Sequence, residues 1–194
     1  TSDADSPDYL KDKALDALLW QVPFPHEVPC YNPVCHRVFG IFGASYAHKQ
    51  LNEATHNALG RVFGEISTEP FLQLATILRY GRAVDAQGQD SYMDKPQNIV
   101  IPIDFVAGGD NRIFLPETTL RSLRWLRATH PDAPKTMFTR RVFEDYGHMD
   151  MFIGKSAHQE VFPYLLDRLQ ARAPGQQGKS LANADGMANA DGKA

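Results

Sequence analysis

His148 is the side chain in this sequence that is best placed to do chemistry. It lies in the stretch 143–150, directly after the short apolar run 137–143 and before a helical pattern that begins near Ser156. Imidazole titrates near neutral pH, and the turn at the end of a strand holds a side chain in a fixed position. We therefore predict that His148 is a general base.

The group expected to orient His148 follows an earlier apolar run. Residues 98–107 are nearly all apolar, as in a strand covered on both faces, and they lead into a Gly-Gly turn. Two strands joined by a helix form a parallel βαβ unit whose turns lie at one edge of the sheet. Asp110 is the predicted acid of this edge, with Asn111 as the alternative. An Asn would orient the ring but would not stabilise its charged form.

A nucleophile to accompany this pair is not evident, because the sequence contains no Gly-x-Ser-x-Gly motif. The nearest approach is Ser45, which follows the run 37–42, a possible strand, and precedes a helical pattern. Gly40 interrupts that run and Ala47 replaces the second Gly of the motif. Ser45 is therefore either the nucleophile of a small self-contained hydrolase or a helix cap. Asp150 is likewise either part of the site or a cap for the backbone that follows it.

Composition excludes several classes of protein. The chain has 194 residues, a hydrophobic content of 43%, a net charge of −3 and a pI of about 6.1, so it has no basic footprint for nucleic acid. No apolar run approaches the ~20 residues of a membrane span, and the N-terminus has no signal segment. The chain begins at Thr1 without Met, which we interpret as an interior cut. The compartment stays open.

The two cysteines, Cys30 and Cys35, are too few for a disulfide scaffold. They either close one small loop or remain free thiols. Four prolines between residues 23 and 33 predict an extended covering loop that carries both cysteines and His36. Two Cys and a His invite a zinc interpretation, but we find no second ligand pair with structural-site spacing, so no metal site is predicted.

The elements that must position these residues divide the chain into three parts. Residues 1–92 read as mostly helical, with helices over 7–20 and 51–63 and another that opens at residues 67–70. The third helix should bury Phe71, Leu74, Ala75 and Leu78. Residues 81–93 read as a loop or a short hairpin. The tail 173–194, rich in Gly, Ala and Asn, is predicted to be disordered.

Residues 93–172 read as a βαβα unit. A helix capped at Thr118 or Thr119 and running to about residue 129 joins the two strands, and a final helix runs from about residue 156 to 172. Pro163 should kink this last helix or mark its true start. Two strands are too few to stand alone, so either the helical half covers them or further strands lie N-terminal to residue 1, and we favour the further strands.

Motifs along about residues 10–170 are similar to those of a known family. They are Cys35-His36-Arg37, Gly43, Tyr46-Ala47-His48, Leu51-Asn52, Thr55-His56, Phe63-Gly64, Arg79-Tyr80-Gly81, Pro102-Ile103, Tyr146-Gly147-His148-Met149-Asp150 and Phe152-Ile153-Gly154-Lys155. Together they resemble the C-terminal portion of an α/β-hydrolase, and more closely the hydrolase module fused behind glucose–methanol–choline (cholesterol-oxidase-like) flavoproteins in some bacterial proteins. The resemblance to acid lipases is more distant.

The resemblance implies a partial α/β-hydrolase fold, with residues 1–92 as a helical cap and 93–172 as the last two parallel core strands with their helices. It implies carboxylic-ester hydrolysis of a lipid-like or sterol ester, with His148 as base, Asp110 or Asn111 as its partner and the nucleophile on an absent upstream core. Ser45 would then lie in the cap. FAD would belong to the fused flavoprotein module and not to this chain. An Asn beside His148 would instead suit a non-catalytic scaffold module of such a flavoprotein.

Overall fold

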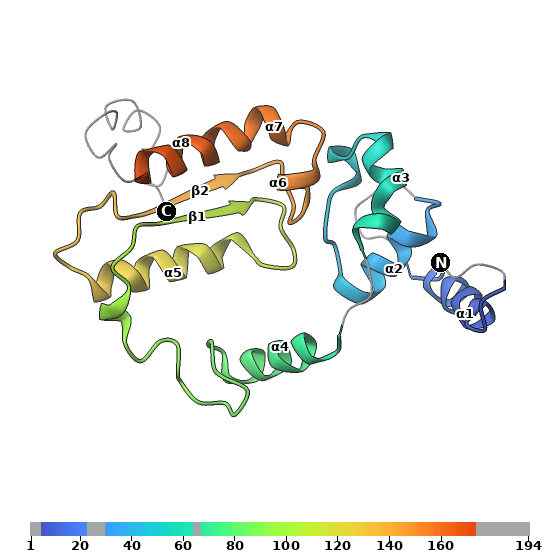
Figure 1. The fold of residues 1–194 in the computed structure, drawn as a ribbon, viewed down its shortest axis with the longest axis horizontal. Helices are drawn as coiled ribbons and strands as arrows, with labels where there is room; N and C mark the ends of the chain where they lie inside the picture. The colour runs from blue at the N-terminus through green and yellow to red at the C-terminus, as the bar shows by residue number, and fades with distance from the viewer. Residues whose placement is uncertain (1–4, 23–29, 64–66, 174–194) are drawn as a thin grey trace.

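The computed structural model describes residues 5–22, 30–63 and 67–173 and has mixed helix and strand (Figure 1). The predicted tail 173–194 therefore lies outside the described residues, apart from Ala173. The N-terminal elements are α1 (Tyr9–Leu19), α2 (Pro33–Phe42), η1 (His48–Gln50), α3 (Glu53–Val62) and α4 (Glu69–Tyr80). The C-terminal elements are η2 (Pro96–Asn98), β1 (Ile103–Gly108), α5 (Pro116–Thr129), β2 (Phe138–Phe143), α6 (Asp150–Ile153), α7 (Ala157–Glu160) and α8 (Phe162–Arg172).

The two strands pair in parallel, as the βαβ pattern predicts. Ile103 pairs with Phe138 and Gly108 pairs with Phe143, so the strands end in register. The strand β1 begins later than predicted, because Pro102 precedes it and the chain forms the short helix η2 first. Val100 and Ile101, which were expected inside the strand, are 74% and 65% exposed.

Alternate side chains of the strands face different helices. Ile103, Phe105 and Phe138 pack with Leu123 and Leu126 of α5. The opposite face of the sheet contacts the helices that follow β2, where Val106 and Phe143 pack around Tyr146 and Val161. This alternation is the period-2 pattern of a strand covered on both faces.

A partly buried ion cluster joins α8 to the sheet. Asp104 of β1 receives Arg168 Nη2 at 2.9 Å and Arg172 Nη2 at 3.1 Å, and it contacts the hydroxyl of Thr139. Burial raises the pKa of Asp104, but the hydrogen bonds from Arg172, Thr139 and Arg168 outweigh it and hold the pKa below its ordinary value.

The predicted loop around Cys35 is wrong, because Pro33 opens the helix α2. The side chain of Asn32 caps this helix by accepting from Val34 N at 2.9 Å, and Pro33 occupies the first turn, where a missing N–H costs nothing. The positive φ of 78° at Gly43 ends the helix. The run 37–42, a possible strand before Ser45, is therefore helical. The part of the predicted loop that contains Pro23, Pro25 and Pro29 lies outside the described residues.

Helix α3 packs beside α2 around a small core. Asn52 caps α3 by accepting from Thr55 N at 2.7 Å. Cys35 and Val38 of α2 pack with Leu59 of α3 and with Tyr46 and Leu51 of the connection.

Helix α4 lies apart from the α2–α3 pair and from the two strands with their helices in Figure 1. Its predicted buried face is wrong for the described part of the chain, since Phe71 is 38%, Leu74 39% and Leu78 71% exposed. Phe71 touches Phe42 with ring centroids 5.8 Å apart. The apolar face of α4 is therefore left largely uncovered by the described residues.

The helix starts predicted in the C-terminal part need small corrections. Helix α5 begins at Pro116, so neither Thr118 nor Thr119 caps it. The predicted final helix is two helices, with a break before Phe162, and Pro163 lies in the first turn of α8.

Candidate functional site

The turns after β1 and β2 lie directly against each other. Gly109 N donates to Phe143 O at 2.8 Å, and Asp110 N donates to Tyr146 O at 2.9 Å. A Cβ atom at Gly108 would lie 2.1 Å from Gly147 O, so only glycine allows this approach. These backbone contacts bring Asn111, the residue after Asp110, to the turn that carries His148.

Asn111 is the residue that meets His148. Its Nδ2 lies 3.1 Å from His148 Nδ1, and the Asn111 side chain is buried. Asn111 Oδ1 accepts from Ile113 N and from Phe114 N, both at 3.0 Å. Because the oxygen is held by two backbone N–H groups, the amide nitrogen must face the ring. Asn111 therefore donates to Nδ1, and the proton of neutral His148 lies on Nε2.

Asp110, the predicted acid, faces another group. Its carboxylate is about half exposed and lies 3.5 Å from Lys49 Nζ. The contact of Asp110 with the histidine turn is made by its backbone N–H, which donates to Tyr146 O. The structure thus brings together His148 and the alternative partner, Asn111, and does not pair Asp110 with His148.

Asp150 shapes the histidine turn. It is fully buried, and its Oδ2 accepts from Gly147 N at 2.8 Å. Burial lowers the pKa of His148 below its ordinary value of 6.5, and the charge of Asp150 opposes that shift without cancelling it. Burial therefore favours the neutral form of the His148 ring over the charged form. Asp150 thus bonds the backbone three residues before it, at Gly147, and not the following backbone that the sequence suggested.

Tyr146 anchors the same turn to α7. Its hydroxyl donates to Glu160 Oε2 at 2.8 Å, and burial together with Glu160 raises the pKa of Tyr146 to about 12. The turn is therefore fixed at both ends, by Tyr146 and by Asp150.

His148 lines an apolar cavity of about 530 Å³ between the helical part and the two turns. Most of its lining is aliphatic or aromatic, and Ser45 supplies the other polar side chain. The cavity is lined by Ile41, Phe42, Ser45, Val62, Phe63, Phe71, Leu74, Ile113, Phe114, His148 and Met149.

Ser45 lies in this cavity but not on a nucleophile elbow. Ser45 follows the end of α2, not a strand, and the next element after it is the short 3₁₀ helix η1. Its hydroxyl donates to Gly43 O at 3.4 Å, and the residue is only 4% exposed. The strand–turn–helix context that would project a serine is absent from this described segment.

The segment that carries Ser45 is bonded to the histidine turn and α6. Met149 N donates to Ser45 O at 2.8 Å, and Lys155 N donates to Gln50 O at 2.7 Å. Gln50 Nε2 also donates to Asp145 O at 2.6 Å. The segment 45–50 is therefore one wall of the His148 site.

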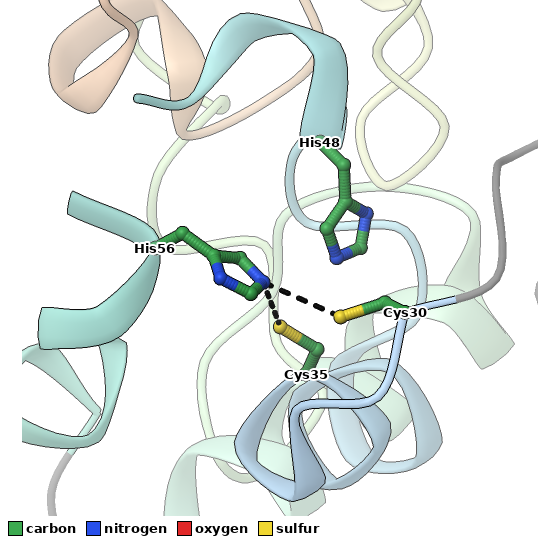
Figure 2. Close-up of side chains that lie close together, drawn as sticks. All are labelled: Cys30, Cys35, His48 and His56. Carbon is green, nitrogen blue, oxygen red and sulfur yellow. Dashed lines mark hydrogen bonds between the residues drawn. The ribbon is translucent and has the colours of Figure 1, made fainter. Parts of the chain in front are cut away.

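A second group of reactive side chains lies in the helical part (Figure 2). Cys30, Cys35, His48 and His56 place one ligand atom each within 4.8 Å of one another, and neither cysteine is disulfide-bonded. Sequence reasoning considered His36 with the cysteines, whereas His36 instead bonds to Leu19 O and Cys30 O and stacks on Trp20. The second ligand pair missing from the sequence argument is His48 and His56.

In comparisons with known proteins, no family model, no curated protein and no solved structure matches this chain. Within the described ranges, no helix combines the length and apolarity needed to cross a membrane. The fold and site define a mixed helix-and-strand protein in which a histidine, held by an asparagine at the end of a parallel strand pair, lines an apolar cavity.

Proposed function

We propose that this chain is the C-terminal part of an α/β-hydrolase-like protein and that it binds an apolar ligand bearing an acceptor oxygen, without using His148 as a general base. The observation that carries the proposal is the hydrogen bond from Asn111 Nδ2 to His148 Nδ1.

That hydrogen bond sets the wrong tautomer for a serine hydrolase. A triad base needs a lone pair on Nε2 to take the serine proton, with Nδ1–H held by a carboxylate. Here Nδ1 accepts, so Nε2 carries the proton and His148 is a hydrogen-bond donor. In serine proteases an Asn in place of the triad acid lowers kcat by about 10⁴ for this reason. Turning the Asn111 amide over would direct its NH₂ group at two backbone N–H groups.

The cavity supports a ligand of the ester class. A volume of about 530 Å³ lies within the ~300–1,000 Å³ usual for small-molecule sites, where apolar walls and a few polar groups set orientation. His148 Nε2–H can donate to a carbonyl oxygen while the apolar walls cover a hydrocarbon or sterol body. A lipid-like or sterol ester meets both requirements.

A parallel strand pair with helices on both faces supports the hydrolase-like class, and the exposed Val100 and Ile101 suit a chain that packs against further core strands. In this proposal those strands, and a flavoprotein module, belong to the same longer polypeptide.

The test is displacement of an apolar fluorophore, 8-anilinonaphthalene-1-sulfonate, by methyl decanoate and by undecane. The wild-type chain should prefer the ester, and His148→Phe, which keeps a ring of similar size, should lose roughly 5–10-fold of that preference, the worth of one hydrogen bond. The exposed His158→Phe is the matched control and should keep it. An equal preference in wild type and His148→Phe contradicts the proposal.

Ester hydrolysis with Ser45 as nucleophile is a second candidate, favoured by one observation: Ser45 and His148 line the same cavity. A fluorophosphonate probe separates the two. Covalent labelling that is lost in both Ser45→Ala and His148→Ala would establish hydrolysis, and an unlabelled folded chain would remove Ser45 from consideration.

A further inference from the structure

We propose that Cys30, Cys35, His48 and His56 form a structural Zn²⁺ site. The proposal does not depend on the function of the His148 cavity. Four side chains from separate segments converge at the proposed zinc site. Cys30 lies just before α2, Cys35 in the first turn of α2, His48 in η1 and His56 in the first turn of α3.

The distances suit one tetrahedral ion. His56 Nε2 lies 3.3 Å from Cys30 Sγ and 3.2 Å from Cys35 Sγ, and all four ligand atoms lie within 4.8 Å of one another (Figure 2). Zinc bonds of ~2.3 Å to sulfur and ~2.0 Å to nitrogen separate ligand atoms by roughly 3.3–3.8 Å around a tetrahedron. Small rotations of the two histidine side chains and two cysteine side chains bring the set to those values.

The chemistry of the donors selects zinc. Two thiolates and two imidazoles are the Cys₂His₂ set of structural zinc sites, whereas magnesium and calcium require oxygen ligands. Binding two thiolates also balances the charge of the ion. Four protein ligands leave no open position for water, which makes the site structural and not catalytic.

The surroundings support the sulfur ligands. Asn32 N donates to Cys30 Sγ at 3.4 Å, and Cys35 lies in the first turn of α2, where the helix dipole favours negative charge. The Asn32 side chain also donates to His56 O at 3.4 Å, which ties the loop before α2 to α3. A disulfide does not compete for the sulfurs, because neither cysteine is disulfide-bonded.

The helical part has a small hydrophobic core that a metal site would stabilise. Its core among the described residues consists of Cys35, Val38, Tyr46, Leu51 and Leu59, which is small for three connected helices. Small units of this kind are commonly stabilised by a metal or a disulfide. One ion would join four segments, and it would hold the segment 45–50 that forms a wall of the His148 cavity.

The sequence carries a signal for this site. Four residues separate Cys30 from Cys35, twelve separate Cys35 from His48, and seven separate His48 from His56. The first two intervals fall within the Cys₂His₂ pattern of about 2–4 and 12 residues, and only the last exceeds its usual 3–5.

The experiment measures zinc in the purified chain after exhaustive dialysis against metal-free buffer. Wild type should retain one zinc per chain, as should the exposed-histidine control His158→Asn. Cys30→Ser and His56→Asn should each weaken zinc binding by more than about 100-fold, because each removes a direct ligand. Removing a residue that only supports a ligand typically costs about 10–100-fold. Cys30 is only partly buried, so its substitution leaves the core in place.

Cobalt(II) gives a readout that needs no variant. The wild-type chain reconstituted with cobalt should show the intense visible bands of tetrahedral coordination and thiolate-to-cobalt charge transfer. A folded wild-type chain that retains no zinc when supplied with it overturns the proposal, as does a cobalt spectrum without thiolate bands. Equal zinc retention in wild type, Cys30→Ser and His56→Asn would show binding elsewhere and would also overturn it.

Discussion

Replacing Asn111 by Asp should change both the pKa and the tautomer of His148. The substitution keeps the shape of the side chain and places a carboxylate 3.1 Å from Nδ1. One carboxylate oxygen would still accept from Ile113 N and Phe114 N, and the other would accept a hydrogen bond from Nδ1–H of His148. An opposite charge at this distance, beside a half-buried ring, should raise the pKa of His148 by about 1–2 units, or roughly 1.4–2.8 kcal/mol.

The same substitution should reverse how stability depends on pH. In the wild type the pKa of His148 is lowered below 6.5, so its contribution is present above that pH and is lost as the pH falls. In Asn111→Asp the pKa is raised, so the added stability is present at low pH and is lost as the pH rises through the new value.

The assay is a titration of the His148 ring protons by NMR, paired with urea unfolding at pH 5 and pH 8. Asp110→Asn is the matched control, since that carboxylate faces Lys49 and should leave the tautomer of His148 unchanged. If Asn111→Asp left the pKa of His148 within a few tenths of a unit of the wild type, the reasoning would be refuted.

Three further outcomes follow from the contacts. Asp104→Asn should cost about 1–3 kcal/mol in urea unfolding, because it leaves two arginines of α8 without their partly buried charged partner. Since the pKa of Asp104 is lowered, its contribution is present above about pH 4 and disappears as the pH falls, so the difference between wild type and variant should shrink in acid. Asp150→Asn should lower the pKa of His148 further, which the same NMR titration measures, because it removes the charge that raises it. Gly108→Ala should lower the melting temperature, since its Cβ would lie 2.1 Å from Gly147 O and the two turns would have to separate, at a cost of roughly 1–3 kcal/mol.

Local sequence signals predicted the parallel strands and the helix between them. Apolar runs that end in glycine-rich turns specify buried strands, and their spacing leaves room for one helix. The partner of His148 could not be chosen in the same way, because Asp110 and Asn111 are adjacent. The choice depends on the backbone bonds of Gly109 and Asp110 to the second turn, and these form only in the folded chain.

The error at α2 came from reading Pro33 as a breaker. A proline after Asn favours the first turn of a helix as strongly as it disfavours a helix interior, and the Asn32 cap made that choice here. The error at α4 has a different origin, since its apolar period is correct but the described residues leave that face exposed. Periodicity reveals which face is apolar, not whether a partner is present.

The cluster of Cys30, Cys35, His48 and His56 lay beyond the sequence argument because its last interval is long. Folding of the connection between α2 and α3 brings His48 and His56 beside the cysteines. A Cys₂His₂ pattern that allows seven residues between the two histidines matches Cys30, Cys35, His48 and His56.

The most direct test of the account is the tautomer of His148 in the wild-type chain. Long-range ¹H–¹⁵N correlation of the imidazole at pH 8, where the ring is neutral, distinguishes a protonated Nε2 from a protonated Nδ1. The account predicts the proton on Nε2, with Nδ1 accepting from Asn111. A proton on Nδ1 would contradict it and would return His148 to the role of general base.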